Sequence, residues 1–136
     1  MSREKPLPHV TETTRPYWEG ARLGKLMLQR CRRCRTAIHY PRPWCSACWS
    51  TDLDWVEAAG RGRVVTFTVV HQPPFEAYAG DVPYVLAVVK LDEGPQMMAN
   101  VLGIEPAAMR VDLPVRVVFE RRSGGFCVPQ FEPARD

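Results

Sequence analysis

Four of the five cysteines in this 136-residue chain form two closely spaced pairs. Two residues separate Cys31 from Cys34 and Cys45 from Cys48, and ten residues lie between the pairs. One C-x2-C turn places two thiolates on one side of a metal ion, and a second turn supplies the other two donors of a tetrahedral site. Four thiolates leave no open coordination position, so the pattern predicts a structural ion. Zinc is the expected metal, and iron in a rubredoxin-like site is the alternative, because spacing does not separate the two.

The residue after each cysteine pair departs from the usual pattern. Glycine is common there because it relieves backbone strain near the sulfur, whereas this chain has Arg35 and Trp49. We therefore expect two less regular metal-binding turns, with all four ligands still in place.

Basic and aromatic residues gather around these turns. The basic ones are Arg30, Arg32, Arg33, Arg35 and Arg42. They form either a solvated face or a site for the phosphates of nucleic acid or coenzyme A, or for an acidic partner. Trp44, Trp49 and Trp55 stand among them. These either pack the metal-binding hairpin onto the rest of the fold or act as hot spots of a protein interface.

The remaining reactive side chains form no recognisable catalytic motif. Cys127 stands alone, as small core cysteines do, and His39 lies between the two cysteine pairs. His71 ends a predicted strand beside a loop, where it is either an ordinary histidine or a functional one. The chain has no P-loop, G-x-S-x-G, H-E-x-x-H or G-x-G-x-x-G sequence, so we expect no catalysis by the chain alone.

The composition is that of an ordinary globular protein, with 46% hydrophobic residues, 24% charged residues and a net charge of +3. The length suits one domain, or one small domain plus an appendage. No apolar run approaches the roughly 18 residues of a membrane helix, and the polar N-terminus lacks the apolar segment of a secretory signal. We therefore expect a cytoplasmic protein whose reduced thiols bind metal.

Residue types along the chain predict a mainly β fold in three parts. Residues 1–23 should form a polar tail and a short helix that begins near Thr14 and Pro16. Residues 24–56 should form the zinc ribbon, and residues 57–136 a barrel with a C-terminal tail. Runs of β-branched and aromatic residues place the barrel strands at 64–71, 84–92, 96–103, 115–120 and 126–131.

Turn residues and prolines complete this expectation. Residues 51–63 are rich in turn formers and predict a connector between ribbon and barrel. Residues 104–114 predict one helical turn, and five strands with such a turn favour the OB-fold, a partly open Greek-key barrel. Pro129 predicts that the last strand is an edge strand or ends early.

The order of several motifs resembles a known family. A helix containing W-E-G precedes the cysteines, G-R-G-R-V-V-T-F-T-V-V-H follows them, and P-Y-V-L-A-V-V-K-L-D-E-G comes next. From Thr14 to Ala134, the chain is similar to the small proteins with a rubredoxin-like zinc ribbon and an OB-fold that accompany thiolase-like enzymes, known as domain of unknown function 35. The cysteine motif alone is generic, and its combination with the helix and the two strands is specific.

This resemblance implies an accessory role. Members of the family bind thiolase-superfamily partners and help to hold acyl-coenzyme A in a shared channel, while the catalytic residues belong to the partner. We accordingly expect a non-catalytic subunit for carbon–carbon bond chemistry of the thiolase or aldolase type, in steroid or fatty-acyl side-chain metabolism. The resemblance carries the zinc ligands over to the four paired cysteines. It implies substrate or partner contacts at Tyr17, Trp18, Phe67, His71 and Phe75.

Two other functions compete with this one. Zinc ribbons and OB-folds also bind single-stranded nucleic acid, through aromatic and basic groups on the barrel strands. The segments VLAVVKL and MMANVL offer almost none, and a net charge of +3 is low for such a protein. A stand-alone hydrolase or transferase would need the catalytic motif that the sequence lacks.

Overall fold

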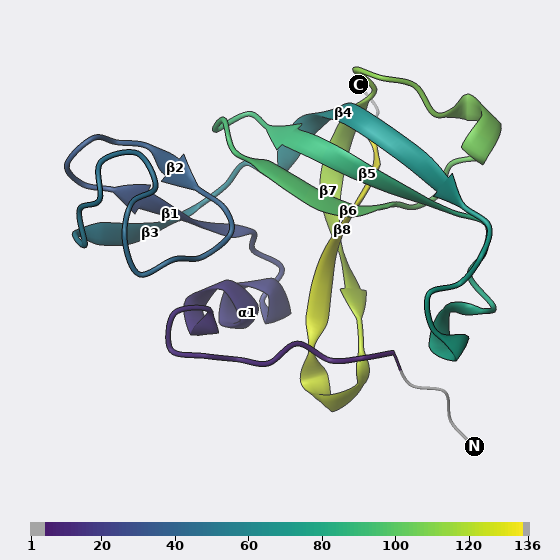
Figure 1. Ribbon diagram of the computed structural model, residues 1–136, viewed down its shortest axis with the longest axis horizontal. Helices are drawn as coiled ribbons and strands as arrows, with labels where there is room; N and C mark the ends of the chain where they lie inside the picture. The colour runs from purple at the N-terminus through teal and green to yellow at the C-terminus, as the bar shows by residue number, and fades with distance from the viewer. Residues whose placement is uncertain (1–4, 135–136) are drawn as a thin grey trace.

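The computed structural model describes residues 5–134, which form a small three-stranded sheet and a closed five-stranded barrel with one helix between them (Figure 1). The sheet has the order β2-β1-β3, and the barrel has the order β4-β5-β6-β8-β7. The helix and the sheet strands are α1 (Arg15–Arg22), β1 (Met27–Cys31), β2 (Ala37–Ile38) and β3 (Leu53–Glu57). The barrel strands are β4 (Arg61–Val70), β5 (Tyr84–Leu91), β6 (Gln96–Val101), β7 (Pro114–Arg121) and β8 (Cys127–Pro133). The expected mainly β architecture is therefore confirmed.

Short 3₁₀ turns lie in three of the loops, at Glu76–Tyr78, Pro106–Ala108 and Ser123–Gly125. The second of these is the helical turn that the sequence predicts between the third and fourth barrel strands. Within residues 5–134, no helix is long and apolar enough to span a membrane.

Helix α1 begins and ends close to the predicted residues, but by a different capping contact. Pro16 lies in its first turn, where a missing N–H costs nothing. Thr14 is the N-cap residue, yet its hydroxyl makes no capping bond and instead accepts the N–H of Thr11 at 2.9 Å. Gly24 follows the helix with φ +77°, a conformation that favours glycine and ends the helix.

Strand β3 replaces part of the predicted connector. Leu53 and Trp55 are half-buried while Asp54 is exposed, which is the alternation of a strand covered on one side. β3 pairs antiparallel with β1, from Cys31 opposite Leu53 to Met27 opposite Glu57. The expectation of a turn-rich connector over these residues is wrong, because they form a paired strand whose acidic residues lie on the solvent side.

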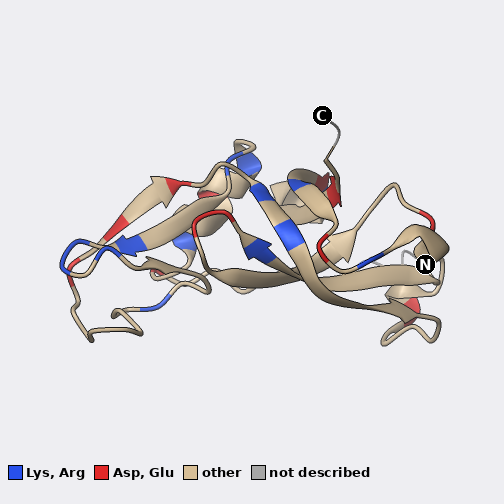
Figure 2. Ribbon diagram, turned by 90° about the horizontal axis from the view of Figure 1, so that it is seen from above, with Lys and Arg blue, Asp and Glu red and all other residues tan. Residues whose placement is uncertain are grey.

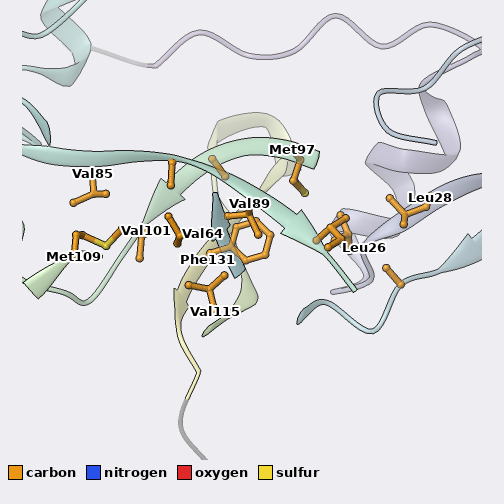
Figure 3. Close-up of a cluster of buried hydrophobic side chains, with 14 of the residues drawn as sticks. Leu26, Leu28, Val64, Val85, Val89, Met97, Val101, Met109, Val115 and Phe131 are labelled. Atoms are coloured by element: carbon orange, nitrogen blue, oxygen red, sulfur yellow. The ribbon is translucent and has the colours of Figure 1, made fainter. Parts of the chain in front are cut away.

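A β-bulge re-aims the side chains of β4. The register with β5 shifts between Val64 and Thr66, and the skipped residue Val65 is 39% exposed. Before the bulge Val64 faces the core, and after it Phe67 packs against the same core. Figure 3 shows the side chains that meet inside the barrel, and the fully buried ones from four different strands are Val64, Val89, Val115 and Phe131.

The barrel closes between β6 and β8 by a narrow seam. Val101 and Phe131 are the one residue pair between the two strands in the described chain, and Leu102 donates its N–H to the Phe131 carbonyl at 2.7 Å. Elsewhere along β6, two side chains accept N–H groups that lack a strand partner. Tyr40, from the ribbon loop, accepts the Met98 N–H at 3.0 Å, and Gln130 of β8 accepts the Asn100 N–H at 2.7 Å.

Strand β8 runs through Pro129 to Pro133, so of the two alternatives that Pro129 suggested, an edge strand or an early end, the early end is wrong. Pro129 lies opposite Phe119 of β7. The Phe131 carbonyl points toward β6, and residues two apart in a strand point their polar groups the same way. Pro129 therefore turns its missing N–H toward the seam, where β8 needs no backbone donor, and the ladder with β7 is unaffected.

Candidate functional site

The four paired cysteines converge at the far end of the ribbon. Cys31 ends β1, and the other three lie in the two turns that follow. All four sulfurs lie within 4.8 Å of one another, with Cys31 and Cys48 3.5 Å apart and Cys34 and Cys45 3.6 Å apart. Sulfurs at 2.3 Å from a tetrahedral zinc ion stand about 3.8 Å apart, so the donor set fits such an ion. The arrangement supports a structural zinc site with no open position.

Hydrogen bonds to the sulfurs favour the thiolate form that a metal requires. Cys31 Sγ accepts the Cys34 N–H at 3.4 Å, and this bond lowers the pKa of Cys31. Cys45 Sγ accepts the Ala47 N–H at 3.3 Å. A hydrogen bond with the Thr36 hydroxyl at 3.1 Å is the largest cause that lowers the pKa of Cys34, to about 6. These contacts favour the thiolate form of Cys31 and Cys34, whereas at Cys48 the Ser50 backbone bond is outweighed by burial and the neighbouring sulfurs, which raise the pKa to about 12.

Each metal-binding turn forces a non-glycine residue into a left-handed conformation. Arg35 has φ +69° and donates its N–H to the Cys31 carbonyl at 2.8 Å. Trp49 has φ +67° and donates its N–H to the Cys45 carbonyl at 2.9 Å. These are the two positions at which the sequence lacks the usual glycine, so the predicted irregularity appears as backbone strain with all four ligands in place.

A second candidate site is a groove of about 600 Å³ over the seam of the barrel. Its walls come from six separate parts of the chain: the N-terminal tail, α1, the ribbon loop after β2, the loop after β4, the loop after β7, and the strands β5, β6 and β8. Its aromatic lining residues are Trp18, Tyr40, Phe75, Tyr78 and Tyr84. A volume of this size and an aromatic lining are typical of small-molecule sites.

The aromatic walls of the groove support one another. The ring centroids of Phe75 and Tyr78 lie 6.2 Å apart, and those of Tyr78 and Tyr84 lie 6.4 Å apart. Trp18, which also lines the groove, meets Phe126 edge-to-face at 6.1 Å. Such contacts hold the rings in place before a ligand arrives.

Ion pairs neutralise most of the charge around the groove. Lys5 bonds Asp81 at 2.5 Å and lies over the Tyr78 ring at 5.3 Å, so the tail is tied to the loop after β4. Arg122, the basic side chain in the lining, bonds Glu120 at 2.5 Å. The groove therefore suits an uncharged, largely apolar chain better than a phosphate.

The five contact residues suggested by the sequence do not lie together. Trp18 and Phe75 line the groove, and Phe75 is 59% exposed. Tyr17 is buried beneath Trp18 at a ring distance of 4.9 Å, and its burial raises its pKa. Phe67 packs against the barrel core, and His71 is exposed just beyond β4, outside the groove lining. Sequence reasoning thus reached two lining residues of the groove and missed Tyr40, Tyr78 and Tyr84.

The missed tyrosines carried a weak signal in the sequence. Tyr78 follows Phe75 by three residues in a proline-rich loop, and Tyr84 opens the next strand. Tyr40 precedes Pro41 in the hairpin between the cysteine pairs, and nothing in the sequence indicates that this loop reaches the barrel. Long-range packing alone brings the three together.

His39 joins the helix, the ribbon and the barrel. Its ring lies 5.4 Å from Tyr17 of α1 and 4.1 Å from Tyr40, whose hydroxyl bonds β6. Both His39 ring nitrogens are buried without a hydrogen-bond partner, and burial lowers the pKa of this histidine to about 4. The ring is therefore neutral at pH 7 and acts as part of the packing between the elements.

A ribbon with a four-cysteine metal centre, joined to a closed five-stranded barrel, defines the class of zinc-ribbon OB-fold proteins. Residues 18–54 match the family model of the ChsH2 rubredoxin-like zinc ribbon domain, and residues 55–120 match the model of the ChsH2 C-terminal OB-fold domain. The chain belongs to this ChsH2-type DUF35 family.

Solved and curated relatives agree with this assignment. A solved structure of the "Ltp2-ChsH2(DUF35) aldolase" aligns over 95% of this chain and 100% of its own, with 36% identity and a TM-score of 0.85. The "probable enoyl-CoA hydratase alpha subunit" of Thermomonospora curvata is 37% identical over 96% of this chain. The "3-oxo-4,17-pregnadiene-20-carboxyl-CoA hydratase alpha subunit" of Mycobacterium tuberculosis is 32% identical over 82% of this chain. The chain spans 40% and 35% of the length of these two curated relatives.

Proposed function

We propose that this chain is a non-catalytic accessory subunit that binds a thiolase-like partner and helps to form the partner's acyl-coenzyme A channel. The proposed chemistry is carbon–carbon bond cleavage or formation of the aldolase or thiolase type, in steroid or fatty-acyl side-chain metabolism in the cytoplasm. The likeness to the Ltp2–ChsH2(DUF35) aldolase and to two coenzyme A hydratase subunits supports this setting.

The aromatic groove over the barrel seam is the observation that carries the proposal. It is open to solvent on one side and lined by the tail, the helix, the ribbon loop and the barrel. A partner that covers the open side would convert it into a channel. Its neutral, aromatic walls suit the pantetheine arm or the acyl group of a thioester, whose apolar parts gain by leaving water.

The chain's residues would then position the substrate and exclude water. Trp18 and Phe75 would hold the apolar arm through their aromatic rings in the groove lining. Asn100 and Gln130 also line the groove. The backbone N–H of Asn100 bonds the side-chain oxygen of Gln130. The side-chain amide of Asn100 and the side-chain NH₂ of Gln130 would then be left to bond a pantetheine amide. Zinc would fix the ribbon loop that carries Tyr40 and would take no part in the reaction.

Co-expression with the Ltp2 subunit of the similar aldolase tests the proposal. We expect a stable complex that cleaves the aldol substrate of that enzyme, and no turnover by the isolated chain. In the complex, Phe75→Ala should raise KM about tenfold, because one wall of the groove is lost. Val111→Ala is the matched control, since Val111 is 55% exposed but lies outside the groove lining.

Two results would contradict the proposed function. One is turnover of acyl-coenzyme A by the isolated chain that a single substitution in the chain abolishes. The other is an active complex whose KM is the same for the wild type, Phe75→Ala and Trp18→Ala, since that would remove the groove from the substrate channel.

A further inference from the structure

The exposed end of the ribbon carries a group of large side chains that the groove does not use. We call this group the knuckle surface, and it consists of Arg33, Arg35, Arg42, Trp44 and Trp49. Arg35 and Trp49 each follow a cysteine ligand, and the four ligand sulfurs lie within 4.8 Å of one another, so the two residues stand at the same end of the ribbon. Figure 2 shows basic segments on the loops at this end.

Trp49 makes no evident contribution to the stability of the fold. This side chain is 73% exposed, and its backbone has φ +67°, a conformation that glycine adopts freely and other residues adopt at a cost. Arg35 occupies the equivalent position of the other turn, at φ +69° and exposed. Strain retained at two exposed positions points to a role outside the chain's own stability.

The two exposed tryptophans form a flat apolar platform. Trp44 is 44% exposed, and its ring stacks on that of Trp49 at 6.1 Å with an interplanar angle of 12°. Trp55, by contrast, packs against the main core. Exposed tryptophan and arginine side chains are the residue types most enriched at the energetic centres of protein interfaces.

The loop that carries Trp44 is held in place by a buried side chain. Gln29 is buried, and its side-chain amide accepts the Arg42 N–H and donates to the Arg42 carbonyl, both at 2.7 Å. This pair of bonds fixes the loop two residues before Trp44. A binding surface that is ordered in advance loses less conformational entropy when a partner docks.

The arginines of the knuckle surface are free to meet a partner's charges. Arg32, between the cysteines of the first pair, is already held by Asp52 at 3.1 Å and Asp54 at 3.4 Å. Within residues 5–134, no carboxylate lies within salt-bridge distance of Arg33, Arg35 or Arg42. Zinc with four thiolates would carry net negative charge, of which Cys34, exposed between Arg33 and Arg35, presents a part at the surface, whereas Cys31 and Cys45 are buried.

We propose that the knuckle surface docks an acidic segment of a partner protein, with carboxylates on the arginines and an apolar side chain on the tryptophan platform. A protein partner fits better than nucleic acid for two reasons. The tryptophans stack on each other with ring centroids 6.1 Å apart, which covers part of one face of each ring that a base would need, and similar proteins are named as subunits of complexes. The knuckle surface shares no residue with the groove lining, and the inference rests on the proposed function only where Ltp2 serves as the partner in the test.

Glycine substitutions separate docking from folding. Trp49→Gly and Arg35→Gly remove the left-handed strain, so the thermal midpoint of the zinc-loaded chain should stay the same or rise. Association with the Ltp2 subunit, measured by calorimetry, should weaken at least tenfold for Trp49→Gly and should become less sensitive to salt for Arg35→Gly. Val111→Ala again serves as the exposed apolar control and should leave both quantities unchanged. Equal affinities for Ltp2 of the wild type and both glycine variants would overturn the inference and leave the proposed function intact.

If Ltp2 does not bind the wild type, that result counts against the proposed function and not against the knuckle surface. A second probe then tests the knuckle surface. Poly-L-glutamate should then quench the tryptophan fluorescence of the wild type in a saturable manner, and Trp49→Gly and Arg35→Gly should weaken this binding. Binding of oligothymidylate more tightly than poly-L-glutamate, or binding of neither probe, would overturn the inference.

Discussion

At the scale of single residues, Cys45 carries the clearest expectation. It is fully buried, and its sulfur completes the four-thiolate set. Structural zinc in small ribbons contributes about 10–16 kcal/mol of apparent binding free energy, so Cys45→Ala should release the metal and melt the ribbon. Elemental analysis and circular dichroism of protein purified without added metal check this. Cys127→Ala should keep one zinc ion per chain, and a metal-free, fully folded wild type would contradict the prediction.

His39 should make the protein sensitive to acid. Its folded pKa, about 4, lies below the value of about 6.5 in an unfolded chain, so the unfolded state takes up a proton first as the pH falls. The free energy of unfolding is fully retained above pH 6.5 and should fall by up to about 2 kcal/mol between pH 6.5 and 5. Urea titrations at several pH values check this. His39→Phe should flatten the pH dependence over that range, and an unchanged slope would exclude His39 as its source.

The sequence predicted the metal ligands because their chemistry is local. Cys31, Cys34, Cys45 and Cys48 are recognisable from spacing alone, and so is the irregularity at Arg35 and Trp49. The groove could not be predicted in this way. Tyr40 and Phe75 are 35 positions apart in the chain and line the same groove only because the ribbon loop bonds β6.

At the scale of the elements, Gly62 allows the barrel strands to pack closely because it has no Cβ atom. It lies between Leu91 of β5 and Val115 of β7, and a Cβ atom there would meet the Lys90 carbonyl oxygen at 2.5 Å. Backbone atoms yield less than side chains, so Gly62→Ala should lower the free energy of unfolding by about 1–3 kcal/mol. Gly80→Ala is the matched control, because a Cβ at Gly80 has open space around it. Urea denaturation compares the two, and equal stability of both variants would show that the strands can shift apart.

The helix and the strands were predictable where the pattern of residue types extended over enough positions. Strands β4, β5 and β7 carry runs of β-branched residues, and the helix carries a proline at its start. Strand β3 was missed because only five residues belong to it and two of them, Asp54 and Glu57, are acidic. The end of β8 was misjudged because a proline forbids a strand only where its neighbour needs the N–H, and this depends on which neighbour lies on that side.

At the scale of the whole molecule, acyl-coenzyme A should bind the complex far better than the isolated chain. One side of the groove is open in the isolated chain, so half of the proposed channel is missing. We expect micromolar affinity for the complex, about −8 kcal/mol, and much weaker binding by the chain alone. Calorimetry at two salt concentrations checks this, with single-stranded DNA as the comparison ligand.

The DNA arm separates this function from nucleic-acid binding. Single-stranded DNA should bind the isolated chain weakly and with a steep salt dependence, as non-specific phosphate contacts do. Tight binding that resists salt, without acyl-coenzyme A binding to any complex, would favour the nucleic-acid function instead.

The seam between β6 and β8 is a part of the barrel wall that can open locally. Along it, the amide protons of Met98 and Asn100 are held by side chains and not by a neighbouring strand. Rotation of Tyr40 or Gln130 is enough to release them, and side-chain rotations need no unzipping of a ladder. The groove lies directly over this wall, with Tyr40, Met98, Asn100 and Gln130 all in its lining. An occupant of the groove would therefore rest on a seam where β6 is held to β8 by one residue pair and by side chains, and a local opening there would widen the groove.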